Sequence, residues 1–200
     1  MRWDNLFDDL EGQLEQELSA EELDVRAEEE RLRLGRLTIR DRLLAVDEAQ
    51  PRGSAYSVRV FLSDGSVVAV RPVTFGRDWF SADVVDESTR STQCIIPIAA
   101  IASLALTRPQ LAASLAVDAP DPRRPALPAR LSLGFVLRDL CRRRSAVELR
   151  TAGGVLRGTI DRVGRDHLDL AVHEAGQPRR DAVVSHSRLV PLAQVVLVRL

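Results

Sequence analysis

The chain has 200 residues with a formal net charge of −1, and its composition argues against several classes of protein. Its two cysteines, Cys94 and Cys141, stand in separate apolar stretches and lack the close Cys or His spacing of a zinc site, so neither a disulfide framework nor a zinc site is supported. No apolar run reaches about 18 residues and no basic start precedes one, so we expect neither a membrane span nor a signal peptide. These features favour a reduced, cytoplasmic setting.

The charges are unevenly distributed along the chain, and every basic residue other than histidine is an arginine. Residues 1–36 hold 5 Arg against 12 Asp and Glu, whereas residues 131–200 hold 12 Arg against 7 Asp and Glu. The near-neutral total therefore combines an acidic beginning with a basic C-terminal region.

The acidic beginning has the pattern of an amphipathic helix. Trp3, Phe7, Leu10 and Leu14 follow one another at steps of four, three and four residues, which places them on one helical face among carboxylates. We therefore predict an acidic amphipathic helical head over residues 1–36. Large apolar side chains on such a helix are typical of a ligand for a groove in a protein partner. The predicted partner-binding residues are Trp3, Leu6, Phe7, Leu10 and Leu14. The alternative is that this face packs on the chain itself or dimerises.

The rest of the chain contains an internal repeat. Gly65 and Gly153 are 88 residues apart, as are Gly76 and Gly164, so the copies align without a gap across two turns. Pro97 and Pro191 are 94 residues apart, which indicates a loop six residues longer in the second copy. We predict two copies of one small domain, over residues 37–107 and 131–200.

Each copy is expected to begin with a short helix and to continue with five strands. Thr38 and Ser132 are the expected helix caps. Asp64-Gly65 and Gly153-Gly154 suit the tight turn of a hairpin, and a proline begins a single turn before the last strand. Between the copies, residues 108–130 hold five of the ten prolines, so we predict a semi-rigid linker there.

A helix followed by five short strands with these turns resembles the Sm-like barrel. The stretch from Val155 to Leu170, VLRGTIDRVGRDHLDL, is similar to the first Sm motif, with a glycine in the second strand and alternating apolar positions after the turn. The first copy has Val70 where the second has this glycine, and Pro72 follows it. The expected fold is mainly β with some α: two Sm/SH3-like five-stranded small barrels, each preceded by a short helix, plus the N-terminal helical segment. SH3-like and PRC-type barrels are the competing assignments.

Nearly the whole chain is also similar to a group of uncharacterised actinobacterial proteins that combine an acidic N-terminal helix with two such units. The absence of lysine agrees with that resemblance. It implies an architecture and carries no activity.

Resemblance to Sm-like proteins also suggests RNA as a ligand. The arginines that could contact phosphates are Arg142, Arg143, Arg144, Arg157, Arg162, Arg165, Arg179, Arg180 and Arg188. The Arg-Gly pair of the second Sm motif is missing at residues 185–190, and Phe135 is the only Phe, Tyr or Trp in residues 131–200. The solvated surface of an ordinary domain, or a docking face for the acidic head, is the alternative interpretation.

No catalytic constellation is apparent in the sequence. His167, His173 and His186 are the only histidines, and no nucleophile elbow, phosphate loop or dinucleotide signature is present. We therefore expect no enzyme activity, no metal, no cofactor and no small-molecule substrate. The predicted function is a protein-interaction or scaffold module that binds a protein partner or associates with itself, and the alternative is an RNA-binding protein that uses the basic second copy.

Overall fold

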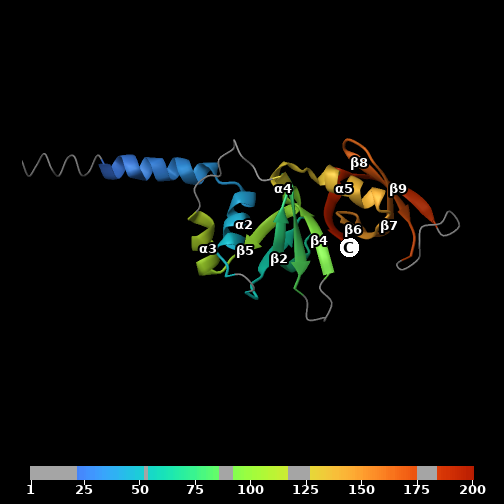
Figure 1. Ribbon diagram of the computed structural model, residues 1–200, viewed down its shortest axis with the longest axis horizontal. Coiled ribbons are helices and arrows are strands. Elements are labelled where there is room, and N and C mark those ends of the chain that lie inside the picture. Colours follow the sequence, from blue (N-terminus) through green and yellow to red (C-terminus); the bar gives the residue numbers. More distant parts are fainter. Residues whose placement is uncertain (1–21, 52–53, 86–91, 117–126, 175–183) are drawn as a thin grey trace, which may run out of the picture. The chain divides into compact units, whose positions relative to one another are not determined.

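The structure, a computed structural model, describes residues 22–51, 54–85, 92–116, 127–174 and 184–200 (Figure 1). The chain divides into two compact units, Met1–Thr38 and Ile39–Leu200, and each is described here by itself.

The described part of the first unit is helical over residues 22–36. Its surface carries ion pairs one turn apart, between Glu22 and Arg26 at 3.5 Å and between Glu30 and Arg33 at 2.7 Å. Pairs at this spacing stabilise an exposed helix weakly. The predicted partner-binding residues, from Trp3 to Leu14, lie outside the described residues.

The second unit contains the two copies of the repeat, and the first repeat is built of α2 and β1–β5. The elements up to the middle of the unit are α2 (Ile39–Glu48), β1 (Val58–Leu62), β2 (Val67–Phe75), β3 (Trp79–Val84), β4 (Thr92–Pro97), a 3-10 turn (Ile98–Ala100), β5 (Ile101–Ala105) and α3 (Arg108–Leu115).

The second repeat is built of α5 and β6–β10. The remaining elements are α4 (Leu127–Arg130), α5 (Leu133–Arg142), β6 (Ala146–Thr151), β7 (Gly154–Val163), β8 (His167–Val172), β9 (His186–Pro191), a 3-10 turn (Leu192–Gln194) and β10 (Val195–Arg199). A helix and five strands therefore occur in each repeat, as expected from the sequence.

All ten strands belong to one open antiparallel sheet with the order β5-β1-β2-β3-β4-β10-β6-β7-β8-β9. The fold is thus mainly β with a few helices. Strand β4 pairs with β10 of the other repeat, so the two repeats share a continuous sheet. The finer expectation, that each repeat closes into a barrel of its own, is not established by this pairing.

The internal repeat extends to the register of the strands. Trp79 lies opposite Pro97 in the first repeat, and His167 lies opposite Pro191 in the second. Both repeats also have a β-bulge at the equivalent place, between Pro72 and Thr74 and between Ile160 and Arg162. The offsets of 88 residues for β2 and β3 and of 94 residues for β4 therefore describe equivalent backbone positions.

The strand before the hairpin departs from the ungapped alignment by one residue. Val58 pairs with Val70, but it is Val147 that pairs with Gly158, so β1 and β6 are 89 residues apart. The positive-φ glycines of the two turns, Gly65 and Gly154, have the same spacing of 89 residues. The turn is one residue shorter in the second repeat. A one-residue slip would turn every side chain of the strand to the other face, so burial of Val147 fixes this register.

The glycine in the second strand of the second repeat has a structural reason. A Cβ atom at Gly158 would clash with the backbone carbonyl of Ala171 on β8. Val70 takes the equivalent position in the first repeat and is fully buried there. The backbone of β8 therefore leaves no room for a side chain at this position of β7, so only glycine fits.

The segment predicted as a linker begins with a helix. Thr107 caps α3 through a reciprocal pair of hydrogen bonds with Gln110, and the Gln110 side chain also donates to the Ser57 carbonyl at 3.1 Å. Ser114 is buried and accepts from the Arg42 guanidinium of α2 at 3.0 Å. Residues 108–115 are therefore part of the packed unit, and residues 117–126 lie outside the described residues.

Each repeat has a hydrophobic core of its own, and the two cores exchange a few residues. Trp79 and Ile95 belong to the first repeat by sequence but are buried in the cluster of the second. Conversely, Val196 and Leu197 of the second repeat are buried in the cluster of the first. This exchange takes place where β4 meets β10, and we call that contact the joint.

Candidate functional site

At the joint, the two repeats bind each other through strand pairing and apolar burial. Ile95 lies opposite Val198 and Cys94 opposite Arg199 in antiparallel pairing, and the backbone N–H of Leu200 donates to the Gln93 carbonyl at 2.9 Å. All four residues from Val195 to Val198 are buried. An edge strand of the first repeat is thus paired and covered by an edge strand of the second.

The turn before β3 forms a second part of the joint. The Asp78 carboxylate accepts from the backbone N–H of Leu133 at 2.7 Å, at the start of α5. The backbone N–H of Arg77 and the indole N–H of Trp79 both donate to the Leu131 carbonyl, at 2.9 and 3.0 Å. Ser132, the expected cap of this helix, makes no side-chain cap hydrogen bond. The cap comes instead from Asp78, because the turn of the other repeat places its carboxylate over the first helical turn.

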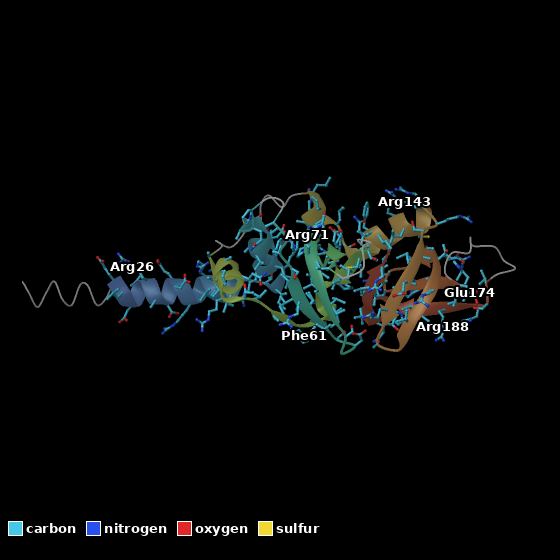
Figure 2. All side chains as sticks on the ribbon, turned by 90° about the horizontal axis from the view of Figure 1, so that it is seen from below. Arg26, Phe61, Arg71, Arg143, Glu174 and Arg188 are labelled. Atoms are coloured by element: carbon cyan, nitrogen blue, oxygen red, sulfur yellow. The ribbon has the colours of Figure 1, made fainter. Side chains whose placement is uncertain are left out.

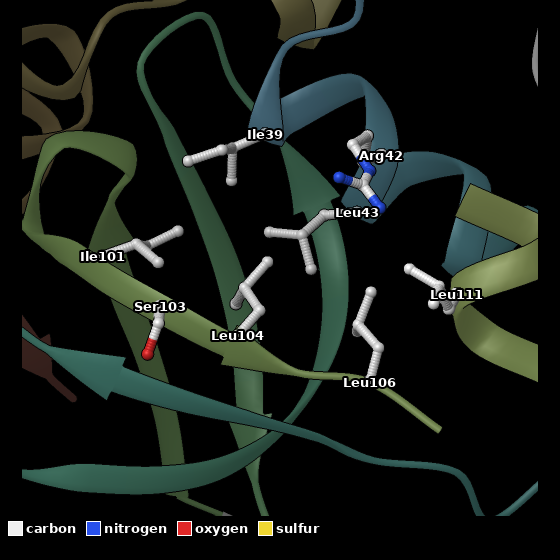
Figure 3. Close-up of a pocket in the computed structure, with 8 residues that line it drawn as sticks. All are labelled: Ile39, Arg42, Leu43, Ile101, Ser103, Leu104, Leu106 and Leu111. Carbon is white, nitrogen blue, oxygen red and sulfur yellow. The ribbon is translucent and has the colours of Figure 1, made fainter. Parts of the chain in front are cut away.

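The first repeat has an apolar groove at the position where the second repeat receives Trp79 and Ile95. This cavity of about 430 Å³, which we call the β5 groove, lies between α2, α3 and β5 (Figure 3). It is lined by Ile39, Arg42, Leu43, Ile101, Ser103, Leu104, Leu106 and Leu111.

Half of the residues that line the β5 groove occupy positions equivalent to residues buried at the joint. Four groove residues have equivalents, 94 positions later in the chain, that are buried in the second hydrophobic cluster. Ile39, Leu43, Ile101 and Leu104 correspond to Leu133, Leu137, Val195 and Val198. Ile39 is 45% exposed, whereas Leu133 is 7% exposed. The difference arises because the neighbouring repeat covers one groove, while no described residue covers the other to the same extent.

The opposite end of the sheet shows the complementary situation. Strand β9 is the equivalent of β4, and among the described residues it pairs only with β8. Its Leu189 is 68% exposed, whereas Ile95 at the equivalent position is 3% exposed. His167, the equivalent of Trp79, is partly exposed and its Nδ1 lies 2.8 Å from the exposed Asp166 carboxylate.

An ion pair also links the repeats at the hairpin of the first. The Asp64 carboxylate lies 3.9 Å from the Arg150 guanidinium on β6. Burial raises the pKa of the Asp64 carboxyl, but hydrogen bonds from Ser66 and the charge of Arg150 outweigh it, so the pKa lies below its usual range. Asp64 is therefore ionised at neutral pH, where it stabilises its own turn and attracts Arg150 of the second repeat.

The arginines proposed for RNA binding are only partly brought together. Arg144, Arg162 and Arg188 line one shallow depression, but Asp161 and Asp169 line it as well. Arg143 at the end of α5 and Arg188 on β9 extend from separate elements (Figure 2).

Several of the other arginines are engaged with carboxylates. Arg142 and Arg143 pair with Asp139, and Arg157 pairs with Glu148 at 2.8 Å. Arg165 is exposed, and Arg179 and Arg180 lie outside the described residues.

The histidines make local contacts. His173 is buried, with Nε2 2.9 Å from the Thr159 hydroxyl and Nδ1 3.0 Å from the Glu174 carbonyl. Among the described residues, no group of three or more His, Cys, Asp or Glu side chains could hold a metal ion. No helix in the described segments is long and apolar enough to cross a membrane.

Comparison of the chain with protein-family models, with curated proteins and with solved structures found no match. The candidate site therefore depends on the geometry of the molecule alone.

Sequence reasoning missed the β5 groove and the exposed face of β9. A position-by-position comparison of the copies contains the signal, because residues of unlike polarity replace one another at the joint. Trp79 corresponds to His167, Cys94 to Arg188, and Leu197 to Ser103. Such replacements indicate that the two copies have different surroundings at the same backbone positions.

Proposed function

We propose that this chain is a non-enzymatic protein-interaction or scaffold module built from two Sm/SH3-like small barrels. The proposal is supported by the strand order, because each repeat has its leading helix and the same neighbour sequence, β5-β1-β2-β3-β4 and β10-β6-β7-β8-β9. The separate hydrophobic cluster of each repeat also supports it.

One observation carries the functional part of the proposal. The β5 groove is open, and the equivalent surface of the second repeat is filled by protein side chains, Trp79 and Ile95. A surface of this construction therefore receives protein elsewhere in the same molecule. Apolar grooves beside an unpaired strand are typical binding sites for an added strand.

The proposal is tested by a charge placed in the groove. Ser103 is exposed and lines it, so Ser103→Glu leaves the core intact while burying a carboxylate under any bound protein. In a nuclease-treated pull-down, we expect this variant of the full chain to lose a protein that the unaltered chain captures. If the partner is a second copy, we expect the oligomeric mass to fall instead. Val73→Glu is the matched control, since Val73 is exposed on β2 and does not line the groove.

The predicted contribution of the N-terminal helix has its own variant. Trp3→Ala combined with Phe7→Ala removes the largest apolar side chains of the helix predicted there and is expected to abolish binding of a co-purified protein or to change the oligomeric mass. An unchanged partner list and an unchanged mass in both this variant and Ser103→Glu would contradict the proposed function.

RNA binding is the second candidate, favoured by the depression that Arg144, Arg162 and Arg188 share. Two aspartates in the same depression reduce its positive potential, so we rank RNA binding below protein interaction. The test is binding of single-stranded RNA over a range of salt concentrations, because phosphate contacts weaken steeply as salt rises. RNA binding would strengthen after removal of the acidic residues 1–36, and the absence of salt-sensitive binding would end this proposal.

A further inference from the structure

We propose that the β5 groove binds a second copy of this chain, with β9 of one molecule adding to the free side of β5 in the next. The inference depends on the proposed interaction function and names its partner. The joint inside the chain is the template, because it already unites the equivalents of these two strands.

Both surfaces that such a contact needs are exposed in the same molecule. Strands β5 and β9 end the ten-stranded sheet, and each pairs on one side only among the described residues. The other side of each strand presents backbone N–H and C=O groups that a further strand can pair. The β5 groove lies beside one end of the sheet, and Leu189 is exposed on the strand at the other.

The internal joint predicts the register of the contact between molecules. Subtracting 94 from the β10 residues and adding 94 to the β4 residues places Leu104 opposite Leu189 and Ala105 opposite Arg188. The same shift directs the backbone N–H of Leu106 to the carbonyl of Ser187, as Leu200 donates to Gln93 within the chain.

The turn before β8 has the parts to copy the turn before β3. Trp79 lies over Gly76, where a Cβ atom would clash with the indole, and His167 lies over Gly164 in the same way. Asp166 is 86% exposed, and it is the equivalent of Asp78, the carboxylate that accepts from the first turn of α5. We infer that His167 and Leu189 of one molecule enter the β5 groove of the next, with Asp166 at the first turn of its α2.

The contact between molecules is expected to be weaker than the joint. Ser103 replaces Leu197, and His167 replaces Trp79, so less apolar surface is buried. One feature recurs with the two strands exchanged. At the joint, Arg199 of β10 lies opposite the small Cys94 of β4. Between molecules, Arg188 of β9 would lie opposite the small Ala105 of β5. We therefore expect reversible, concentration-dependent association.

The two surfaces differ, so the contact is heterologous. A pair of molecules leaves one β5 groove and one β9 edge free for further copies. Repeated heterologous contacts close into a ring or continue as an open fibre, according to the rotation that each contact introduces.

The first test uses one variant for each surface of the full chain. Ser103→Glu blocks the groove and Leu189→Glu blocks the edge, and both residues are exposed, so the fold is retained. We expect each variant alone to be monomeric by light scattering, and a mixture of the two to form a one-to-one dimer and nothing larger. Each variant keeps the surface that the other has lost. Val73→Glu and Val155→Glu, at exposed positions of β2 and β7, are the matched controls and should associate like the unaltered chain.

The second test measures the register. Ala105 and Arg188 are predicted to form a non-hydrogen-bonded pair, with Cα atoms about 4.5 Å apart, within the range that a disulfide spans. Mixing Ala105→Cys chains with Arg188→Cys chains under oxidising conditions should yield a covalent dimer. Ala105→Cys mixed with Leu189→Cys is the control, because neighbouring residues of a strand point to opposite faces and should link far less.

The third test strengthens the contact. Ser103→Leu and His167→Trp restore at the free surfaces the residues found at the joint. We expect each to tighten association by about tenfold, since burial of one further large apolar side chain is sufficient for that change.

Three outcomes would overturn the inference: a full-length chain that is monomeric at every concentration, dimers formed by either blocked variant alone, or no preference for the Ala105–Arg188 link. If the chain is monomeric but captures a different protein in a way that Ser103→Glu abolishes, the inference fails and the proposed function stands. If the chain neither associates nor binds a partner that is lost in Ser103→Glu or in the Trp3→Ala, Phe7→Ala variant, both fail.

Discussion

The Asp78 carboxylate accepts a hydrogen bond of 2.7 Å from the backbone N–H of Leu133, and this contact joins two residues of different repeats that are 55 positions apart in the chain. Asp78 thereby caps α5, whose N-cap residue Ser132 makes no side-chain cap hydrogen bond. The same turn places Trp79 against the second core, so local capping and packing between the repeats depend on each other.

Asp78→Ala is expected to lower the free energy of unfolding by about 1 kcal/mol, within the ~0.5–2 kcal/mol range of helix-cap losses. Urea denaturation of a dilute sample measures the change. Asp166→Ala removes the equivalent carboxylate from the exposed turn of the second repeat and should leave stability almost unchanged. Equal losses in the two variants would show that Asp78 acts only within its own turn.

Ile95→Ala is expected to destabilise the chain by about 2–5 kcal/mol, because it leaves a cavity in the second core. The matched change is Leu189→Ala, at the equivalent but exposed position, where we expect an effect of less than about 0.5 kcal/mol. Thermal unfolding at low protein concentration distinguishes them. A small effect of Ile95→Ala would mean that the joint contributes little to folding.

The hydrogen bonds from Ser66 and the charge of Arg150 make the contribution of Asp64 to stability depend on pH in a defined direction. Because the pKa of Asp64 is lowered in the folded state, its contribution is fully present above the unfolded pKa of about 3.9 and is lost as the pH falls through the lower folded pKa. Asp64→Asn should therefore reduce stability at neutral pH, by no more than about 1 kcal/mol, and have progressively less effect below pH of about 4. Urea midpoints at a series of pH values provide the measurement, and a constant difference down to strong acid would contradict the assignment.

Cys94 reports on the joint because it lies on β4 opposite Arg199. Burial raises the pKa of its thiol to about 11, so the folded protein has almost no reactive thiolate there at neutral pH. We expect a thiol reagent to label at most Cys141, which is partly exposed, until denaturant opens the chain. Rapid labelling of both cysteines in native buffer would show that the joint opens readily. Labelling of Cys94 should be faster in the Asp78→Ala chain than in the Asp166→Ala chain, because only Asp78 contributes to the joint.

Much of the fold follows from local sequence. Glycine turns, alternating apolar residues and the proline before each last strand determine the structure of residues close to them in the sequence. These local signals predicted a helix and five strands in each repeat. Helix α3 shows the limit of such reading. Proline content suggested a spacer, but the Thr107 and Gln110 side chains cap a helix and Ser57, far away in the chain, accepts from Gln110.

The sequence by itself determined the duplication, since identical turns recur at fixed spacing and backbone conformation at a turn depends on its own residues. Only the tertiary structure decided which of the duplicated surfaces are covered. Trp79 and Ile95 are buried in the other repeat, whereas His167 and Leu189 at equivalent positions are partly or largely exposed. That distinction depends on β4 pairing with β10 across about half of the chain, and hydrophobic patterning within one strand cannot specify such a long-range partner.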